Sequence, residues 1–378
     1  GFAKYGEKPM VAVYTAHNME TGLEQQCIAY SLDQGKHFEK YYGNPVIKNP
    51  GTPDFRDPRV FWNDKKDCWS LVLASGDHAE FYASQDLKNW KKTGEFGVGV
   101  NKVPTVWECT DLIRAKTGNE FDGFKWILIV SMIHPGTEGR ANIQYFVGDF
   151  DGDTFQCTEI TDEPLWIDFG FDNYAGVTYG NYDRQVYLGW GVNPLYANFV
   201  PTGEYSGLMT LPRELRYMNG RLYQNPVEEL KQYRKNPCCL KDQEISGTVQ
   251  FDEVRGRMLD LTVEIENGQF DEFCLELAHN MEYTTTYTYN RKKQIMEVDR
   301  TCCGVTKDVI CRRIWKVTEG KETLKLRFIL DRQSIELFVN DGEQVVTTAI
   351  CTPMEADEIV FSCDGKAKVN VEKYEIVV

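Results

Sequence analysis

The sequence has no long apolar run and little of the chemistry that phosphate or nucleic-acid binding requires. No stretch of eighteen consecutive apolar residues occurs in its 378 residues, which predicts that no helix spans a membrane. A net charge of −15 argues against a nucleic-acid partner, because proteins that bind phosphate backbones concentrate lysine and arginine. The sequence also lacks a glycine-rich phosphate loop. The net charge would neither favour nor oppose the binding of a neutral ligand.

Histidine is scarce, and cysteine is not arranged for metal binding. The five histidines show no spacing to partners that would indicate a Ser/His/Asp triad. Apart from the adjacent pairs Cys238-Cys239 and Cys302-Cys303, the twelve cysteines are scattered through apolar runs. This is not metal-ligand spacing, so we expect no metal and no cofactor. Buried thiols favour a reducing compartment, but localisation stays open because a leader peptide would precede Gly1.

Three turn phrases recur along the first part of the chain. They lie at residues 31–38, 84–90 and 149–155, and in each an acidic residue turns the chain before an aromatic residue. The period of about fifty to sixty-five residues is that of a β-propeller blade. Counting these units predicts roughly four blades before residue 235.

The pattern changes after residue 235 to long alternating strands. Residues 324–330, 334–339 and 344–349 are predicted to be consecutive antiparallel strands, the last two joined by a hairpin at Asn340-Asp341-Gly342. Helix-period segments are almost absent, and residues 227–233 are the best candidate. We therefore expect an all-β protein with two domains, a β-propeller at 1–235 and a β-sandwich at 236–378.

Acidic residues recur with the blade period, out of phase with the turns. Asp57 and Glu108 each lie where an apolar, strand-like run begins, and Asp168 continues the spacing. In a propeller the first strand of each blade lines the central channel, so one carboxylate per blade would meet the others on the axis. Asp57 and Glu108 are therefore expected to face one shared pocket.

Several phrases carry a family resemblance that runs through nearly the whole chain. The most specific are Arg56-Asp57-Pro58 and Trp107-Glu108-Cys109, and the others lie at residues 25–31, 44–47, 144–152, 168–175, 188–190 and 209–215. In this order they resemble glycoside hydrolase family 32, the invertases, levanases and inulinases. The resemblance implies a five-bladed β-propeller followed by a β-sandwich, and a β-fructosidase activity.

The resemblance also implies roles for three residues. Glu108 would be the acid/base, and Asp57 would hydrogen-bond fructosyl hydroxyls and support an oxocarbenium-like transition state. Arg56 would orient the Asp57 carboxylate or bind a hydroxyl itself. The alternatives are an arginine partner at a blade edge for Glu108 and a plain strand-entry turn for Arg56-Asp57-Pro58.

Four further residues are substrate-binding candidates on the same grounds. Cys109 would lie beside the acid/base, although a packed thiol explains it equally well. Trp190 would stack on a sugar ring or pack as an axial core tryptophan. Asp168 and Asp172 would hold Arg56 or a sugar hydroxyl, or would cap turns.

One block of the family is absent from the sequence. Family members open with a Trp-Met-Asn-Asp-Pro-Asn-Gly-like phrase whose aspartate is the nucleophile, but no Asn-Asp-Pro occurs in the 378 residues. We therefore expect the nucleophile and most of the first blade to belong to a preceding segment or another chain, which would close the propeller. On this interpretation the 378 residues alone are inactive.

The expected partner is a fructose-containing saccharide, such as sucrose, inulin or levan. Aromatic residues make up 13% of the chain, which suits a site for sugar rings, although most are expected to pack in the core. Two alternatives stay open: a sugar-binding relic that never had the nucleophile, and a fructosyltransferase on the same scaffold.

Overall fold

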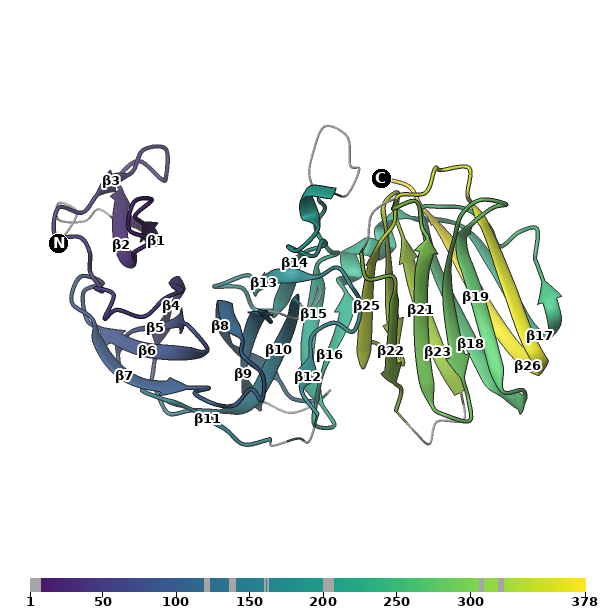
Figure 1. Ribbon diagram of the computed structural model, residues 1–378, viewed down its shortest axis with the longest axis horizontal. Helices are drawn as coiled ribbons and strands as arrows, with labels where there is room; N and C mark the ends of the chain where they lie inside the picture. Colours follow the sequence, from purple (N-terminus) through teal and green to yellow (C-terminus); the bar gives the residue numbers. More distant parts are fainter. Residues whose placement is uncertain are drawn as a thin grey trace. The chain divides into compact units, whose positions relative to one another are not determined.

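The computed structural model describes residues 8–118, 123–135, 141–159, 161, 163–199, 207–305, 309–318 and 323–378. These residues are almost entirely β-strand (Figure 1), with two short 3-10 helices, η1 (Ala197–Phe199) and η2 (Glu228–Tyr233). The predicted helix at 227–233 therefore exists as a 3-10 helix. No helix in the described part of the chain is long and apolar enough to cross a membrane. All twelve cysteines are unpaired thiols.

The chain divides into two compact units. The first contains residues 1–165 and 175–183, and the second contains residues 166–174 and 184–378. Two short strands, β12 (Leu165–Trp166) and β13 (Tyr174–Thr178), lie where the chain passes between the units. This division differs from the boundary at residue 235, which concerns the predicted propeller and sandwich domains and stays a prediction.

The first unit consists of three small antiparallel sheets, each a meander of consecutive strands. The first sheet contains β1 (Met10–His17), β2 (Glu24–Ser31) and β3 (Glu39–Lys40). The second contains β4 (Phe55–Asn63), β5 (Cys68–Ser75), β6 (His78–Ser84) and β7 (Lys91–Phe96). The third contains β8 (Val106–Lys116), β9 (Phe124–Ile133), β10 (Ala141–Phe150) and β11 (Phe155–Cys157). Such meanders are the units of a β-propeller.

The three predicted turn phrases occupy one position in these sheets, immediately before the last strand of each. In each phrase an aspartate side chain accepts backbone N–H groups two to four residues further on; these aspartates are Asp33, Asp86 and Asp151. Each aspartate accepts hydrogen bonds from the backbone of its own turn. Because these contacts join residues close in sequence, the turns could be predicted from sequence alone.

Apolar strands bury both faces between neighbouring sheets. Val72 and Phe81 of the second sheet and Trp107, Leu128 and Phe146 of the third share one buried cluster. The Trp107 ring is stacked on Phe146 with centroids 5.5 Å apart. Residues beside Trp107 on β8 are thereby held in place for the site described below.

The second unit begins with another small meander, β14 (Val186–Trp190), β15 (Arg213–Met218) and β16 (Arg221–Pro226). The remaining strands form the sandwich; they are β17 (Arg234–Val249), β18 (Leu259–Gln269), β19 (Glu272–His279), β20 (Thr284–Asn290), β21 (Ile295–Cys302), β22 (Arg312–Lys316), β23 (Thr323–Leu330), β24 (Ser334–Val339), β25 (Gln344–Ala349) and β26 (Glu358–Ile376).

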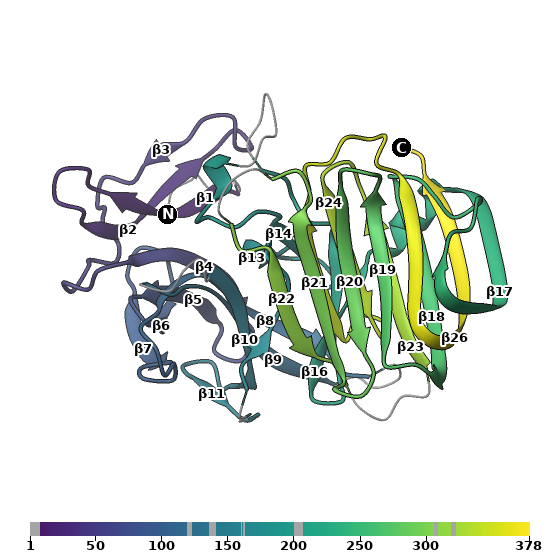
Figure 2. The same cartoon turned by 45° about the vertical axis from the view of Figure 1, so that its right-hand side comes forward.

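One long strand joins the two layers of the sandwich (Figure 2). β26 pairs with β19 near its beginning and with β18 near its end, while β17 runs along its other edge. β19 to β22 make one layer, and β18 with β23 to β25 make the other. The predicted strands at 324–330, 334–339 and 344–349 match β23, β24 and β25 to within one residue. The predicted all-β fold class, a propeller followed by a sandwich, is confirmed.

Candidate active site

Two β-bulges define the site in the first unit. The pairing of β4 with β5 shifts register between Arg56 and Arg59, and the pairing of β8 with β9 shifts between Glu108 and Asp111. Each bulge contains a residue in the left-handed region, Asp57 at φ 62° and Cys109 at φ 49°. Non-glycine residues adopt this conformation at an energetic cost, and bulges commonly re-aim side chains beside active sites.

The two bulges bind each other at equivalent positions. Three contacts join them, and each links residues 52 positions apart in the sequence. They are Arg56 Nη2 to Glu108 Oε1 at 2.8 Å, Cys109 N–H to Asp57 Oδ2 at 2.8 Å, and Arg59 Nε to Asp111 Oδ1 at 3.2 Å. The structure thus brings Arg56, Asp57, Glu108 and Cys109 together. The blade spacing concerned only the carboxylates of Asp57 and Glu108, and the chemical roles of all four residues stay predictions.

Arg56 is surrounded by carboxylates. Besides Glu108, its guanidinium binds Glu24 Oε2 at 3.0 Å and Asp54 Oδ1 at 2.7 Å. The side chains of Arg56 and Glu108 are 21% and 17% exposed, so solvent reaches both. One arginine therefore faces three carboxylates, and Asp57 lies beside them. Sequence reasoning missed Glu24, and it set Asp54 aside as lying too near Asp57 to be the nucleophile, without predicting its contact with Arg56.

The electrostatics of the bulges differ from those of free side chains. Burial raises the pKa of Asp57, and the negative charge of Glu108 raises it further, while the Cys109 N–H opposes the shift. Burial, followed by the Asp57 charge, raises the pKa of the Cys109 thiol. Cys109 is therefore a protonated thiol at neutral pH, and its backbone N–H binds Asp57.

Hydrogen bonds with polar residues of the first sheet support the β4 bulge. The Asp57 N–H donates to Thr15 Oγ1 at 3.1 Å, and Thr15 in turn donates to Gln26 at 2.8 Å. The Gln26 amide is fully buried and donates to the Phe55 carbonyl at 2.8 Å. The first sheet thereby fixes the position at which β4 bulges.

Asp111 supports the β8 bulge through buried contacts. Its carboxylate is fully buried; Oδ2 accepts the N–H and the hydroxyl of Thr178, both at 2.7 Å, and Oδ1 faces Arg59. Arg59 also donates to the Thr178 carbonyl at 2.8 Å. The only sequence signal for Asp111 was its place three residues after Glu108.

The second unit contains the other three candidates. Asp168 is 5% exposed and accepts the N–H groups of Gly170 and Thr347, both at 2.8 Å, and Arg213 Nη1 at 3.1 Å. The Gly170 contact is the turn-capping alternative. Trp190 is partly buried and packs against a small cluster that contains Val192. Its predicted contact with a sugar stays a prediction.

Asp172 is fully buried in its own cluster. Its carboxylate accepts hydrogen bonds from Arg300, the Tyr196 hydroxyl and the Ala349 N–H, the last at 2.7 Å. Sequence reasoning did not find Arg300, which lies 128 residues later. Both aspartates are thus engaged by buried groups, and contact with a saccharide stays a prediction for each.

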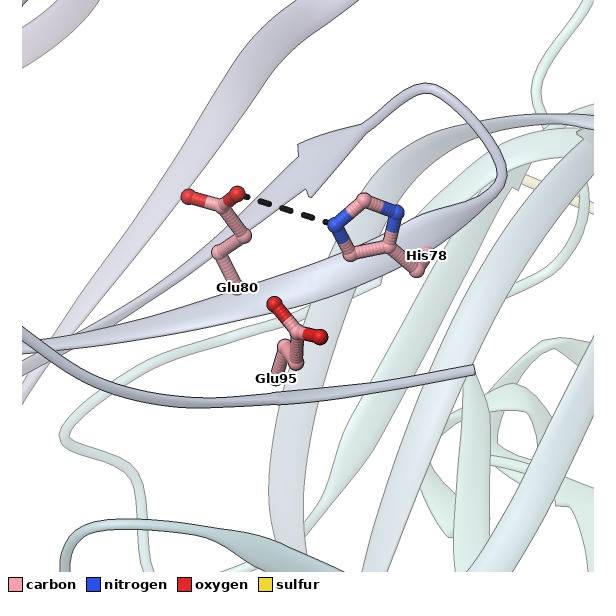
Figure 3. A group of neighbouring side chains, drawn as sticks. All are labelled: His78, Glu80 and Glu95. Atoms are coloured by element: carbon pink, nitrogen blue, oxygen red, sulfur yellow. Dashed lines mark ion pairs between the residues drawn. The ribbon is translucent and has the colours of Figure 1, made fainter. Parts of the chain in front are cut away.

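His78, Glu80 and Glu95 form a group whose possible ligand atoms lie within 4.8 Å of one another (Figure 3). The Lys92 ammonium already binds both carboxylates, Glu80 at 2.9 Å and Glu95 at 2.8 Å. His78 Nε2 lies 3.6 Å from Glu80. A metal ion would have to displace a cation that neutralises the same oxygens, so this group is an ion-pair cluster.

Comparisons with known proteins agree with these features. The model described as "Glycosyl hydrolases family 32 N-terminal domain" matches residues 1–226, and "Glycosyl hydrolases family 32 C terminal" matches residues 229–377. The chain is 36% identical over 393 residues to a levanase of Bacillus subtilis (strain 168), covering 98% of this chain and 57% of the levanase. It therefore spans little more than half of that relative.

Solved structures extend the likeness to three dimensions. The exo-inulinase from Aspergillus awamori superposes with a TM-score of 0.89 at 28% identity, covering 100% of this chain and 81% of that one. A β-fructofuranosidase from Schwanniomyces occidentalis, complexed with fructosyl-erythritol, superposes with a TM-score of 0.85 at 25% identity, covering 99% and 80%. The order of the sequence phrases, the paired bulges and these matches lead to one assignment: the chain belongs to glycosyl hydrolases family 32.

Proposed function

We propose that this chain supplies the acid/base and the transition-state-stabilising carboxylate of a glycoside hydrolase that cleaves β-fructosyl linkages with retention, as in sucrose, inulin or levan. The supporting observation is the contact between the two bulges: Asp57 Oδ2 accepts the Cys109 N–H at 2.8 Å, and Arg56 binds Glu108, whose side chain is 17% exposed. Relatives described as levanase and exo-inulinase support the substrate class.

Glu108 is the proton carrier in this proposal. In the first step its carboxyl group gives a proton to the leaving oxygen while a carboxylate attacks the anomeric carbon from the opposite face. In the second step the Glu108 carboxylate takes a proton from water, whose oxygen displaces the attacking carboxylate. Arg56 holds Glu108 Oε1 through Nε and Nη2, at 3.1 and 2.8 Å, and so fixes the direction of transfer.

Asp57 acts on the fructosyl unit and does not transfer protons. Its bulge directs the carboxylate to the Cys109 N–H at 2.8 Å, which leaves the group oriented before substrate arrives. A negative charge there stabilises the positive charge that develops on the sugar ring in an oxocarbenium-like transition state. Hydrogen bonds to fructosyl hydroxyls supply specificity.

In this proposal the attacking carboxylate belongs to an Asn-Asp-Pro phrase like that of the family, which does not occur among the 378 residues. Retaining glycosidases place the two carboxyl groups about 5 to 5.5 Å apart, so the supplying segment must reach Glu108. The missing phrase also favours a second candidate, a saccharide-binding protein without catalysis. A fructosyltransferase differs from the hydrolase only in whether water or a sugar hydroxyl receives the fructosyl group.

The test compares the 378 residues with a version that adds an Asn-Asp-Pro block, either fused or as a separate peptide. We expect reducing-sugar release from sucrose, inulin or levan only in the extended protein. In that protein, Glu108→Gln should reduce kcat by about 10³-fold or more, whereas the control Glu39→Gln on exposed β3 should not. The added segment should also raise the melting temperature.

Two results would count against the proposal. Hydrolysis by the 378 residues alone, abolished by Glu108→Gln, would show that another carboxylate of this chain is the nucleophile. Saccharide binding without hydrolysis in the extended protein would favour the binding relic.

A further inference from the structure

The second unit has a polar pocket on the outer face of its sandwich, remote in sequence from the bulges. Its volume is about 560 Å³, within the range of sites for small molecules. The lining comes from β17, β26, β18, β23 and β24, with Asn225, Lys231 and Asp341 at its margins. β17, β26, β18 and β23 are successive neighbours in this sheet (Figure 1).

The floor of the pocket consists of two rows that cross three paired strands. Because Leu261, Val263 and Ile265 of β18 face the core, the residues between them point outward into the pocket. The strand register sets them beside outward residues of β26 and β23. The rows are Glu372, Thr262 and Arg327, and Asn370, Glu264 and Lys325.

Asp260 anchors the basic side chains at one end of the floor. It is 1% exposed, and it binds Arg234 through Nε and Nη2, at 2.8 and 2.7 Å, and Arg327 through Nε and Nη2, at 2.9 and 2.8 Å. The Arg234 guanidinium lies 4.5 Å from the centre of the Tyr374 ring. Both guanidinium groups line the pocket, and both side chains are 17% exposed.

The charges of the pocket cancel. Five basic and four acidic side chains line it, and Asp260 beneath them adds a fifth carboxylate. An anion would meet the carboxylates and a cation would meet the basic groups, so neither gains from entering. A hydroxyl group donates one hydrogen bond and accepts others, so a molecule rich in hydroxyls can satisfy both kinds of group.

From this arrangement we propose that the pocket is a second, non-catalytic binding site for a neutral saccharide chain. Each row has an acceptor on β26 and a donor on β23. Glu372 already accepts the Tyr374 hydroxyl, Asn370 the Asp242 N–H, and Lys325 binds Asp341 at 2.9 Å. These contacts hold the side chains in place, and the remaining lone pairs and N–H groups match the alternating hydroxyl groups along a saccharide. The site would hold part of a polymer to the protein independently of cleavage. The choice of a fructan as the first probe rests on the proposed function; the pocket itself does not.

The test is native gel electrophoresis of the chain in gels that contain inulin, with dextran as a second saccharide. Thr262→Trp fills the centre of the floor with a side chain that strands accept well. Its matched control is Thr286→Trp, an outward position of β20 in the other layer. We expect retardation by a saccharide, an apparent association constant about tenfold lower for Thr262→Trp, and no change for Thr286→Trp.

Further measurements separate this proposal from the catalytic one. Retardation that survives the double replacement of Asp57 by Asn and Glu108 by Gln supports the pocket, whereas retardation abolished by that replacement alone overturns it. Retardation by dextran but not inulin supports the pocket and counts against fructan as its ligand. Retardation that disappears in about 0.5 M salt indicates a charged ligand and overturns the neutral one, since salt screens charge interactions. No retardation by either saccharide also overturns it.

Discussion

Arginine and carboxylate groups cluster in both units, but the clusters differ in burial and in balance. In the first unit Arg56 is 21% exposed and faces three carboxylates, those of Glu24, Asp54 and Glu108. In the second unit Arg213 and Arg300 are 0% and 1% exposed. Arg213 binds Glu336 through Nε and Nη2 and Asp168 through Nη1, and Arg300 binds Asp172.

The difference separates a cluster that solvent reaches from clusters that are closed to solvent. A buried arginine without its carboxylates would leave charges in a medium that solvates them poorly, so these clusters are complete in themselves. The Arg56 cluster has surplus negative charge and is partly exposed to solvent, as the proposed function requires. Asp57, Glu108, Asp168 and Asp172 look alike in the sequence, and burial distinguishes them.

The largest expected loss of stability comes from removing the arginine of a buried cluster. Arg300→Met leaves the Asp172 carboxylate buried without its cation, which should lower the free energy of unfolding by about 3 to 5 kcal/mol. Arg56→Met opens a cluster that water reaches, so its cost should be about 1 kcal/mol. Calorimetric melting of both variants measures the contrast. Adding Asp172→Asn to Arg300→Met should restore part of the loss, and equal losses for Arg300→Met and Arg56→Met would refute the comparison.

The Glu80 cluster should give an intermediate, pH-dependent effect. Although burial alone would raise the pKa of Glu80, hydrogen bonds from His78, Tyr82 and Lys92 lower it from 4.5 to about 2. A lowered carboxyl pKa stabilises the folded state above about pH 4.5, and that stability is lost as pH falls toward 2. Glu80→Gln should therefore cost roughly 2 kcal/mol at pH 7.

The check is urea unfolding of Glu80→Gln and the unmodified protein between pH 7 and pH 3. The difference in unfolding free energy should shrink steadily below pH 5, because both proteins then approach a neutral side chain at this position. A difference that stays constant with pH would mean that Glu80 acts through packing and not through its charge.

The smallest expected effect is an increase in stability, and it concerns Asp57 in the candidate active site. Burial raises the pKa of Asp57, so its contribution favours folding below about pH 3.8 and is lost as pH rises through the raised value. At pH 7 the charged group therefore destabilises the fold. Asp57→Asn should raise the unfolding free energy by about 0.5 to 1 kcal/mol at pH 7, while removing the charge that the proposed mechanism needs.

Asp54→Asn is the matched control, because Asp54 also has a positive φ, 55°, and its carboxylate binds Arg56. This substitution removes an ion pair and should not stabilise. Melting temperatures at pH 7 and pH 4 measure the effect, and a destabilised Asp57→Asn would contradict the conclusion that the charged carboxylate destabilises the fold.

Local patterns explain which features were predictable. The three aspartate turns, the Asn340-Asp341-Gly342 hairpin and the alternating strands of the sandwich depend on residues within a few positions of one another. The nearness of the Arg56-Asp57 and Glu108-Cys109 positions was also predictable, but only through the blade period and the resemblance. The bulges were not, since a register shift depends on the neighbouring strand.

Partners distant in sequence account for what was missed. Glu24 reaches Arg56 across 32 positions, and Arg300 reaches Asp172 across 128. No local pattern encodes these contacts, because each depends on how whole sheets pack. The pocket floor likewise exists only when β26, β18 and β23 lie in register.

By itself the sequence determined the all-β class, the blade-sized repeats, the sandwich strands and the family, because these follow from short-range periodicity, turn chemistry and ordered phrases. The tertiary structure decided which carboxylates are buried and which are exposed to solvent. Burial and nearby charges raise the pKa of Asp57. Arginines from distant strands bind Asp168 and Asp172, and the packing of the sheets places Arg56 among three carboxylates. Electrostatic energies depend on distance and solvent access in three dimensions, and neither quantity is written in the order of residues.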